Sequence, residues 1–120
     1  MDWFASDWSC RLDRFCSRFW TLKAELTDAF CHDWEEEESF FHPPVEDLAR
    51  VLEKIEKDGA RGVVMVPDWP GSEVDCLIQQ ARKVVQLEAV MELEFESPLW
   101  REDNTFRGWP NFAMKIFRIR

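Results

Sequence analysis

The sequence predicts an α/β fold in one domain spanning residues 1–120: a small, mostly parallel sheet flanked by helices, with a C-terminal antiparallel strand pair. Apolar segments at 39–41 and 62–66 each run directly into a loop marked by proline. Residues 45–57 between them carry apolar side chains at helical spacing. After residue 87 the apolar period changes from 3.6 to 2. Strands that alternate with helices are typical of sheets that bind ligands at the carboxyl ends of their strands.

The first third of the chain, residues 1–40, has the weakest pattern. Trp8, Leu12, Phe15 and Phe19 have the spacing of one helix face, but the neighbouring aromatic residues do not extend that face. We expect short helix and irregular loop here, packed over the core.

The next segment predicts a helix followed by a strand. The helix has one apolar stripe, a proline at its start and a glycine after its end, and the stripe consists of Val45, Leu48, Val51, Leu52 and Ile55. Residues 63–66 are rich in β-branched side chains, as in a strand covered on both faces. Prolines at 67 and 70 end that strand.

A second helix and two strands complete the predicted fold. Ser72 and Asp75 form a capping pattern before a helical stripe that reaches Val85. Residues 87–96 alternate between apolar and mostly acidic side chains, which indicates a strand with one solvated face near a sheet edge. A loop at 97–110 leads to a last strand at 112–119, which we expect to pair antiparallel with 87–96.

Length and charge limit the classes of function. No apolar run approaches the ~20 residues of a membrane span, so we expect a soluble protein without membrane association. The net charge of −9 is concentrated in residues 32–58, which contribute −7. An acidic surface repels phosphate backbones, so we expect no autonomous binding of nucleic acid. The acidic run is either a solvated loop or a contact for a basic partner, and it comprises Asp33, Glu35, Glu36, Glu37 and Glu38.

Four cysteines, at positions 10, 16, 31 and 76, include no CxxC pair. The N-terminus has neither the basic nor the apolar region of a signal peptide, so we interpret the cysteines as reduced and largely buried thiols. The alternative is a zinc site formed by Cys10, Cys16, Cys31 and His32. Their spacing matches no zinc motif, so we expect no metal.

Several motifs in a fixed order support a family resemblance. They are DWFAS at 2–6, RFCSRFW at 14–20, DAF at 28–30, DW at 33–34, PPV at 43–45, RV at 50–51, ARG at 60–62, VPDWP at 66–70, Ser72, and a weaker FRGWPNF at 106–112. In this order the chain resembles the segment that follows the reverse transcriptase and ribonuclease H regions in polyproteins of DIRS-type and related tyrosine-recombinase retrotransposons. The resemblance implies a transposon-derived, intracellular domain that acts in the cytoplasm or nucleus. Because Met1 stands directly before the first motif, we expect a domesticated gene of its own.

That segment is in turn loosely similar to phage-type adenine-N6 DNA methyltransferases. In those enzymes a strand ends in Asn or Asp, then Pro-Pro, then an aromatic residue, which bind and stack on the flipped base. The matched residues here are His42, Pro43, Pro44 and Val45. Valine has no ring to stack, and imidazole lacks the acceptor geometry of an amide. The glycine-rich loop that would hold the cofactor is also missing, since the chain has only four glycines, at 59, 62, 71 and 108. The resemblance therefore implies a half-Rossmann, methyltransferase-like fold: the latter half of a methyltransferase sheet without its cofactor-binding half.

Other chemistry has less support. His32 and His42 lie near Asp28 and Asp33 in sequence, but a histidine beside a proline loop is usually a hydrogen-bonded structural residue. Asp28, Asp33 and Asp68 show no pattern of three convergent metal ligands. We therefore assign no catalytic residue.

Three hypotheses for function follow. The first is a non-catalytic protein-interaction domain whose surface comprises Trp69, Trp109, Glu35, Glu36, Glu37 and Glu38. The second is an active or degenerate methyltransferase-like enzyme that binds S-adenosylmethionine in a pocket comprising Asp28, Asp33, Trp34, His42, Pro43, Pro44, Val45, Trp69 and Pro70. The third is an obligate homo-oligomer joined by exposed aromatic residues and the last strand. The first requires no cofactor.

Overall fold

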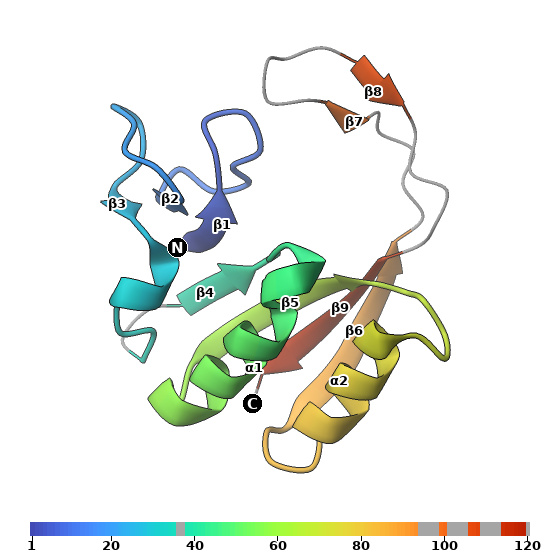
Figure 1. Cartoon of the computed structure of the whole chain (residues 1–120). Helices are drawn as coiled ribbons and strands as arrows, with labels where there is room; N and C mark the ends of the chain where they lie inside the picture. The colour runs from blue at the N-terminus through green and yellow to red at the C-terminus, as the bar shows by residue number, and fades with distance from the viewer. Residues whose placement is uncertain (36–37, 94–98, 101–105, 109–113, 120) are drawn as a thin grey trace.

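Seven strands form one mixed sheet in the computed structural model, which describes residues 1–35, 38–93, 99–100, 106–108 and 114–119 (Figure 1). The strands are β1 (Asp2–Ala5), β2 (Phe15–Ser17), β3 (Leu26–Thr27), β4 (Glu38–Phe41), β5 (Arg61–Pro67), β6 (Leu87–Leu93) and β9 (Met114–Ile119). Their order in the sheet is β3-β2-β1-β4-β5-β9-β6. A separate antiparallel pair contains β7 (Leu99–Trp100) and β8 (Phe106–Gly108).

The strand directions confirm an α/β fold with a mostly parallel sheet. Neighbouring strands from β3 to β5 run parallel, whereas β9 runs antiparallel to both β5 and β6. The predicted pairing of the last two long strands is therefore correct. However, β9 lies between β5 and β6, so both of its edges are already hydrogen-bonded. The last strand therefore has no free edge at which a second copy could pair, and the hypothesis of an oligomer stays a prediction.

The first predicted helix is present as α1 (Leu48–Asp58), preceded by the 3-10 turn η2 (Val45–Asp47). Leu48, Val51, Leu52 and Ile55 form its buried face, as their spacing predicts. Val45 is exposed instead, because it lies in the preceding turn and not on the helix stripe. Gly59 has a φ of 65° and ends the helix in the left-handed conformation that glycine tolerates best.

The second predicted helix is α2 (Glu73–Ala81), and it begins at the predicted cap. The Ser72 hydroxyl accepts a hydrogen bond from the backbone N–H of Asp75 at 3.4 Å. The helix is shorter than the apolar stripe: the backbone forms a turn after Ala81, from which Val85 still packs against the core. Both helices lie on the same face of the sheet and contact each other (Figure 1). In the described part of the chain, neither helix has the length and apolar character to cross a bilayer.

The prediction for the first third of the chain is wrong. In place of a helix, residues 1–35 contain β1, β2, β3 and the short 3-10 helix η1 (Ala29–Cys31). Phe15 is buried in β2, whereas the other members of the expected helix stripe, Trp8, Leu12 and Phe19, are exposed. Strands of two to four residues are too short to show a period. They are held by long-range pairing, such as that of Asp2 with Phe40. The sheet therefore continues beyond β1 to β2 and β3, strands that the expected half-Rossmann arrangement does not contain.

Gly62 sets the close approach of β4 and β5. Its φ is 131°, and a Cβ atom at this position would lie 1.9 Å from the carbonyl oxygen of Ser39. Only glycine fits there without moving β4, the strand that leads into His42.

Candidate functional site

The strand order creates a switch point between β1 and β4. The chain proceeds from β1 outward to β2 and β3, returns to β4, and then proceeds in the opposite direction to β5. Ligands of open α/β sheets bind in the crevice outside the carboxyl ends of the strands at such a point. A cavity of about 860 Å³ lies here, and its wall includes Asp2, Phe4, Phe30, His42 and Arg50.

The structure brings together three of the nine pocket residues that the sequence suggested. Asp28, His42 and Pro44 line the cavity. The others do not line it. Trp34 and Pro43 are buried, Trp69 and Pro70 belong to the loop between β5 and α2, and Asp33 and Val45 are exposed. Sequence proximity to the Pro-Pro motif therefore selected the correct end of β4, but not the correct neighbours.

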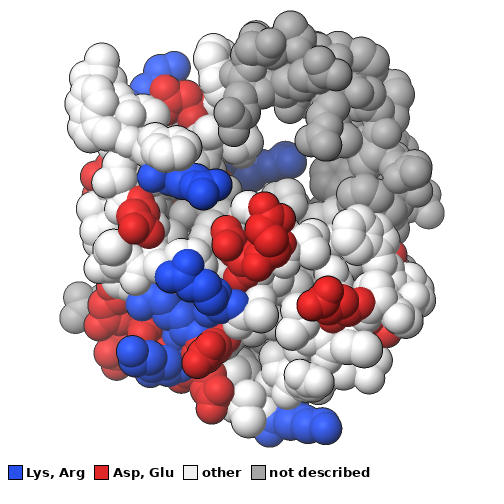
Figure 2. Space-filling model, viewed as in Figure 1, with Lys and Arg blue, Asp and Glu red and all other residues white. Residues whose placement is uncertain are grey.

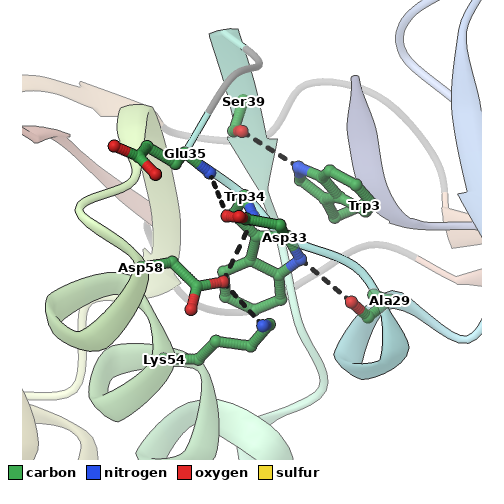
Figure 3. A network of polar contacts seen from close by, with 8 residues as sticks. All are labelled: Trp3, Ala29, Asp33, Trp34, Glu35, Ser39, Lys54 and Asp58. Carbon is green, nitrogen blue, oxygen red and sulfur yellow. Dashed lines mark hydrogen bonds and ion pairs between the residues drawn. The ribbon is translucent and has the colours of Figure 1, made fainter.

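Trp34 is a core residue, not a pocket residue. Its side chain is fully buried, and its ring centroid lies 4.7 Å from that of Phe41. The indole Nε1 donates a hydrogen bond to the carbonyl oxygen of Ala29 at 2.9 Å (Figure 3). The backbone N–H of Trp34 donates to Asp58 Oδ2 at 3.1 Å, and the same carboxylate oxygen accepts from Lys54 Nζ at 2.6 Å. These contacts join η1 and the segment that follows it to the end of α1.

A second tryptophan supports the strands beneath the cavity. Trp3 Nε1 donates a hydrogen bond to the hydroxyl of Ser39 at 2.9 Å, which links β1 to β4 (Figure 3). The ring of His32 stacks on Trp3 with centroids 6.0 Å apart, and its Nε2 lies 2.8 Å from the carbonyl oxygen of Thr27. His32 is therefore the structural, hydrogen-bonded histidine that the sequence analysis favoured.

His42 has a different environment. It follows β4, is partly buried, and lines the cavity. Burial, with a smaller contribution from the charge of Arg11, lowers the pKa of its imidazole from 6.5 to about 4. Among the described residues, none lies within hydrogen-bonding distance of its ring. At neutral pH the cavity thus contains an uncharged imidazole that can accept or donate one hydrogen bond to a ligand.

Asp2 is the polar residue that sequence reasoning missed. Its side chain is 1% exposed and lies in the cavity wall. One carboxylate oxygen, Oδ2, accepts a hydrogen bond from the backbone N–H of Arg11 at 2.8 Å. The other, Oδ1, is buried and has no hydrogen-bond partner in the described part of the chain. Burial raises the pKa of this carboxyl above its ordinary value, although the backbone N–H groups of Arg11 and Phe4 act in the opposite direction. The available signal was an acidic residue directly before the aromatic pair at 3–4.

Aromatic and basic side chains form the rest of the wall. The rings of Phe4 and Phe30 meet edge to face with centroids 5.5 Å apart, and the guanidinium of Arg50 lies 3.9 Å over the ring of Phe30. Three lining arginines, at 11, 18 and 50, are matched in number by three lining aspartates, at 2, 28 and 47. Figure 2 likewise shows acidic and basic groups interspersed over the face that carries α1. The site is mixed in charge and suits a compact polar ligand with a ring better than a polyanion.

The suggested interaction surface is only partly within the described residues. Trp69 is partly buried against the core, and Glu35 and Glu38 are exposed. Glu36, Glu37 and Trp109 lie outside the described residues.

Large exposed apolar side chains occur instead on the loops at 6–14 and 18–25, which are joined by a 2.8 Å hydrogen bond from the hydroxyl of Thr21 to Asp7 Oδ1. We call these side chains the loop patch, and it comprises Trp8, Leu12, Phe19, Trp20 and Leu22.

The cysteines differ from the sequence expectation in their burial. All four are free, but only Cys16 is buried, and the thiols at 10, 31 and 76 are exposed. The thiol of Cys31 donates to Asp28 Oδ2 at 3.1 Å, and this hydrogen bond raises the pKa of the thiol. The described residues contain no group of three or more potential metal ligands, so Cys10, Cys16, Cys31 and His32 do not come together as a zinc site.

No protein-family model matches the chain, and no curated protein is significantly similar to it in sequence.

Proposed function

We propose that this domain binds an adenosine-containing ligand, with S-adenosylmethionine as the candidate, in the cavity between β1 and β4. The observation that carries the proposal is the coincidence of the switch point with a cavity of about 860 Å³. The order β3-β2-β1-β4-β5 is that of the nucleotide-binding doubly wound sheets. The antiparallel pair of β6 and β9 agrees with the methyltransferase resemblance of the sequence.

The lining residues fit an adenosine in part. The aromatic rings of Phe4 and Phe30 supply apolar surface for a base, and the half-buried His42 supplies a ring nitrogen for a hydrogen bond. The turn after β1 contains no glycine to bring the backbone close to a ligand, since residues 2–9 are DWFASDWS. We therefore expect binding through side chains, with lower affinity than a glycine-rich turn would give.

The proposal does not include methyl transfer. The carboxyl end of β4 carries His42, Pro43, Pro44 and Val45, where the resemblance would require an amide or carboxylate and an aromatic ring. The exposed Val45 side chain cannot stack on a flipped base. A transposon-derived binding domain that has lost catalysis accounts for this combination of features.

Two tryptophans of the loop patch provide a matched test. Trp8 and Trp20 are both more than half exposed, but only Trp8 lines the cavity. We expect 5′-methylthioadenosine and S-adenosylmethionine to bind in calorimetric titration with a stoichiometry of one. Stacking on an aromatic side chain contributes about 1–3 kcal/mol, so Trp8→Ala should weaken binding about 5- to 150-fold, and Trp20→Ala should leave it unchanged. No binding to either compound at millimolar concentration would refute the proposal.

A second candidate function, protein interaction without catalysis, is favoured by the loop patch. Its side chains include Leu22 at 90% exposed and Trp20 at 75% exposed. Exposed apolar side chains on two joined loops can mark a protein contact. In affinity capture from cell extract, wild type should retain a protein partner that Trp20→Ala loses. Trp8→Ala should retain more of this partner than Trp20→Ala does. Identical capture by wild type and Trp20→Ala would contradict this candidate, whatever the result with adenosine compounds.

A further inference from the structure

Two side chains in the wall of the cavity have polar groups without a partner in the described part of the chain. The ring of His42 is half-buried and forms no hydrogen bond there. The guanidinium of Arg11 is exposed and forms neither an ion pair nor a hydrogen bond there, since only the backbone N–H of this residue is engaged, by Asp2. Both groups are therefore accessible to a molecule in the cavity.

Arg11 and His42 act on each other across the cavity wall. They follow β1 and β4, two strands that pair in parallel, so the chain segments after these strands meet at the same edge of the sheet. Burial lowers the pKa of the His42 imidazole, and the positive charge of Arg11 acts in the same direction, which places the guanidinium within electrostatic range of the ring. At neutral pH the pair thus consists of an uncharged imidazole, which can donate one N–H, and a cation with five donors.

The other two arginines of the wall have their charges on aromatic rings. The guanidinium of Arg50 lies 3.9 Å over the ring of Phe30, and that of Arg18 lies 5.6 Å from the ring centroid of Phe19. A ring face attracts a cation and partly compensates its charge. Among the described residues Arg11 has no such ring contact, so it is the arginine of the wall that is best able to bind an anion.

The rest of the wall restricts which anion fits. Phe4 and Phe30 supply apolar surface for a ring next to the charged group. Asp28 and Asp47 line the same cavity, so a dianion would be repelled more strongly than a monoanion. A carboxylate carries one charge and can accept two parallel hydrogen bonds from a guanidinium. We infer that the cavity selects ligands that join an aromatic ring to a single carboxylate, which binds between the guanidinium of Arg11 and the His42 ring.

This inference rests on the cavity of the proposed function, but it is testable without nucleosides. 3-Phenylpropionate and 3-phenylpropanamide share a ring and a chain and differ in the charge of the terminal group. 2-Phenylethylphosphonate keeps the ring and the chain and carries a more highly charged oxyanion. Arg11→Gln removes the guanidinium and keeps the backbone N–H that bonds to Asp2. Arg14→Gln is the matched control, because Arg14 is an exposed arginine of the same loop that pairs with Glu25 and is not part of the cavity wall.

In calorimetric titration at pH 7, wild type should bind 3-phenylpropionate at least about tenfold more tightly than the amide, as the strength of charge-assisted hydrogen bonds implies. Arg11→Gln should lose most of this preference, and Arg14→Gln should retain it. The phosphonate should bind more weakly than the carboxylate. In wild type the ¹⁵N resonances of the His42 ring should shift on saturation with 3-phenylpropionate, a measurement that does not depend on the folding of any variant.

Four results would each overturn the inference. They are equal or absent binding of the carboxylate and the amide, tighter binding of the phosphonate than of the carboxylate, a preference that survives in Arg11→Gln, and His42 resonances that do not move.

The two proposals fail separately, because 5′-methylthioadenosine has no carboxylate and tests the adenosine proposal alone. Binding of this compound without any carboxylate preference would retain the adenosine proposal and refute the role of Arg11. A carboxylate preference that depends on Arg11, without binding of any adenosine compound, would refute the adenosine proposal and retain the role of Arg11.

Discussion

Lowering the pH from 7 to 4 should destabilise the folded domain through His42. The pKa of this imidazole is about 4 in the folded protein, against an ordinary value of 6.5 that applies to the unfolded chain. The unfolded chain therefore binds a proton first as the pH falls. The contribution of His42 to stability is therefore fully present above pH 6.5 and is lost between 6.5 and about 4. At about 1.4 kcal/mol per pH unit, the interval corresponds to at most about 3 kcal/mol, of which about 2 kcal/mol is lost by pH 5.

Urea denaturation of wild type and His42→Gln at pH 7, 6, 5 and 4.5 measures this effect. Glutamine is close to histidine in length and does not titrate, so the other ionisable groups contribute equally to both proteins. From pH 7 to pH 5, wild type should lose about 2 kcal/mol more unfolding free energy than His42→Gln does, with most of the change below pH 6. Parallel curves over this range would show that His42 is solvated in the folded protein, and would remove the neutral imidazole from the description of the cavity.

Three further substitutions test the framework of the site by chemical denaturation. Gly62→Ala should cost at least about 3 kcal/mol, because its Cβ would lie 1.9 Å from the Ser39 carbonyl oxygen. Gly59→Ala, with no atom within 4 Å, should cost about 1 kcal/mol from its positive φ alone, and equal losses would contradict the close approach of β4 and β5. Trp34→Ala should cost about 3–5 kcal/mol as a fully buried residue, whereas Trp20→Ala should change stability by less than about 0.5 kcal/mol; similar values would place Trp34 at the surface. Asp58→Ala should cost about 1–3 kcal/mol, since it leaves the Trp34 N–H and Lys54 without their shared acceptor, and Asp58→Asn should recover part of that loss.

Local patterns predicted the second half of the fold because each element there is long enough to show one. The stripe of α1 repeats over three turns, and the helix ends at Asp58, directly before Gly59. The cap of α2 is a contact within four residues, from Ser72 to Asp75. The pairing of β6 with β9 joins consecutive long strands. In each case the information lies within one element or between neighbours in the chain.

The site was predictable only in part, for the opposite reason. The Pro-Pro motif correctly indicated the end of β4, where His42 and Pro44 line the cavity. Trp34 was misassigned, because its burial depends on partners from η1 and α1 that are distant in sequence or connected through a loop. Asp2 was overlooked, because nothing in an acidic residue near the N-terminus indicates that its side chain is enclosed.

The sequence alone thus determined the α/β class, the two helices, the central strand β5 and the antiparallel pair at the end of the chain, since short-range periodicity and capping specify each of them. Only the tertiary structure decided that residues 2–27 add three strands to the sheet, because a strand of two to four residues is specified by its hydrogen-bonded neighbour and not by its own pattern. The cavity between β1 and β4 exists because those strands pair. Its chemistry, a buried carboxylate, a neutral imidazole and aromatic rings, comes from side chains that only this pairing brings together.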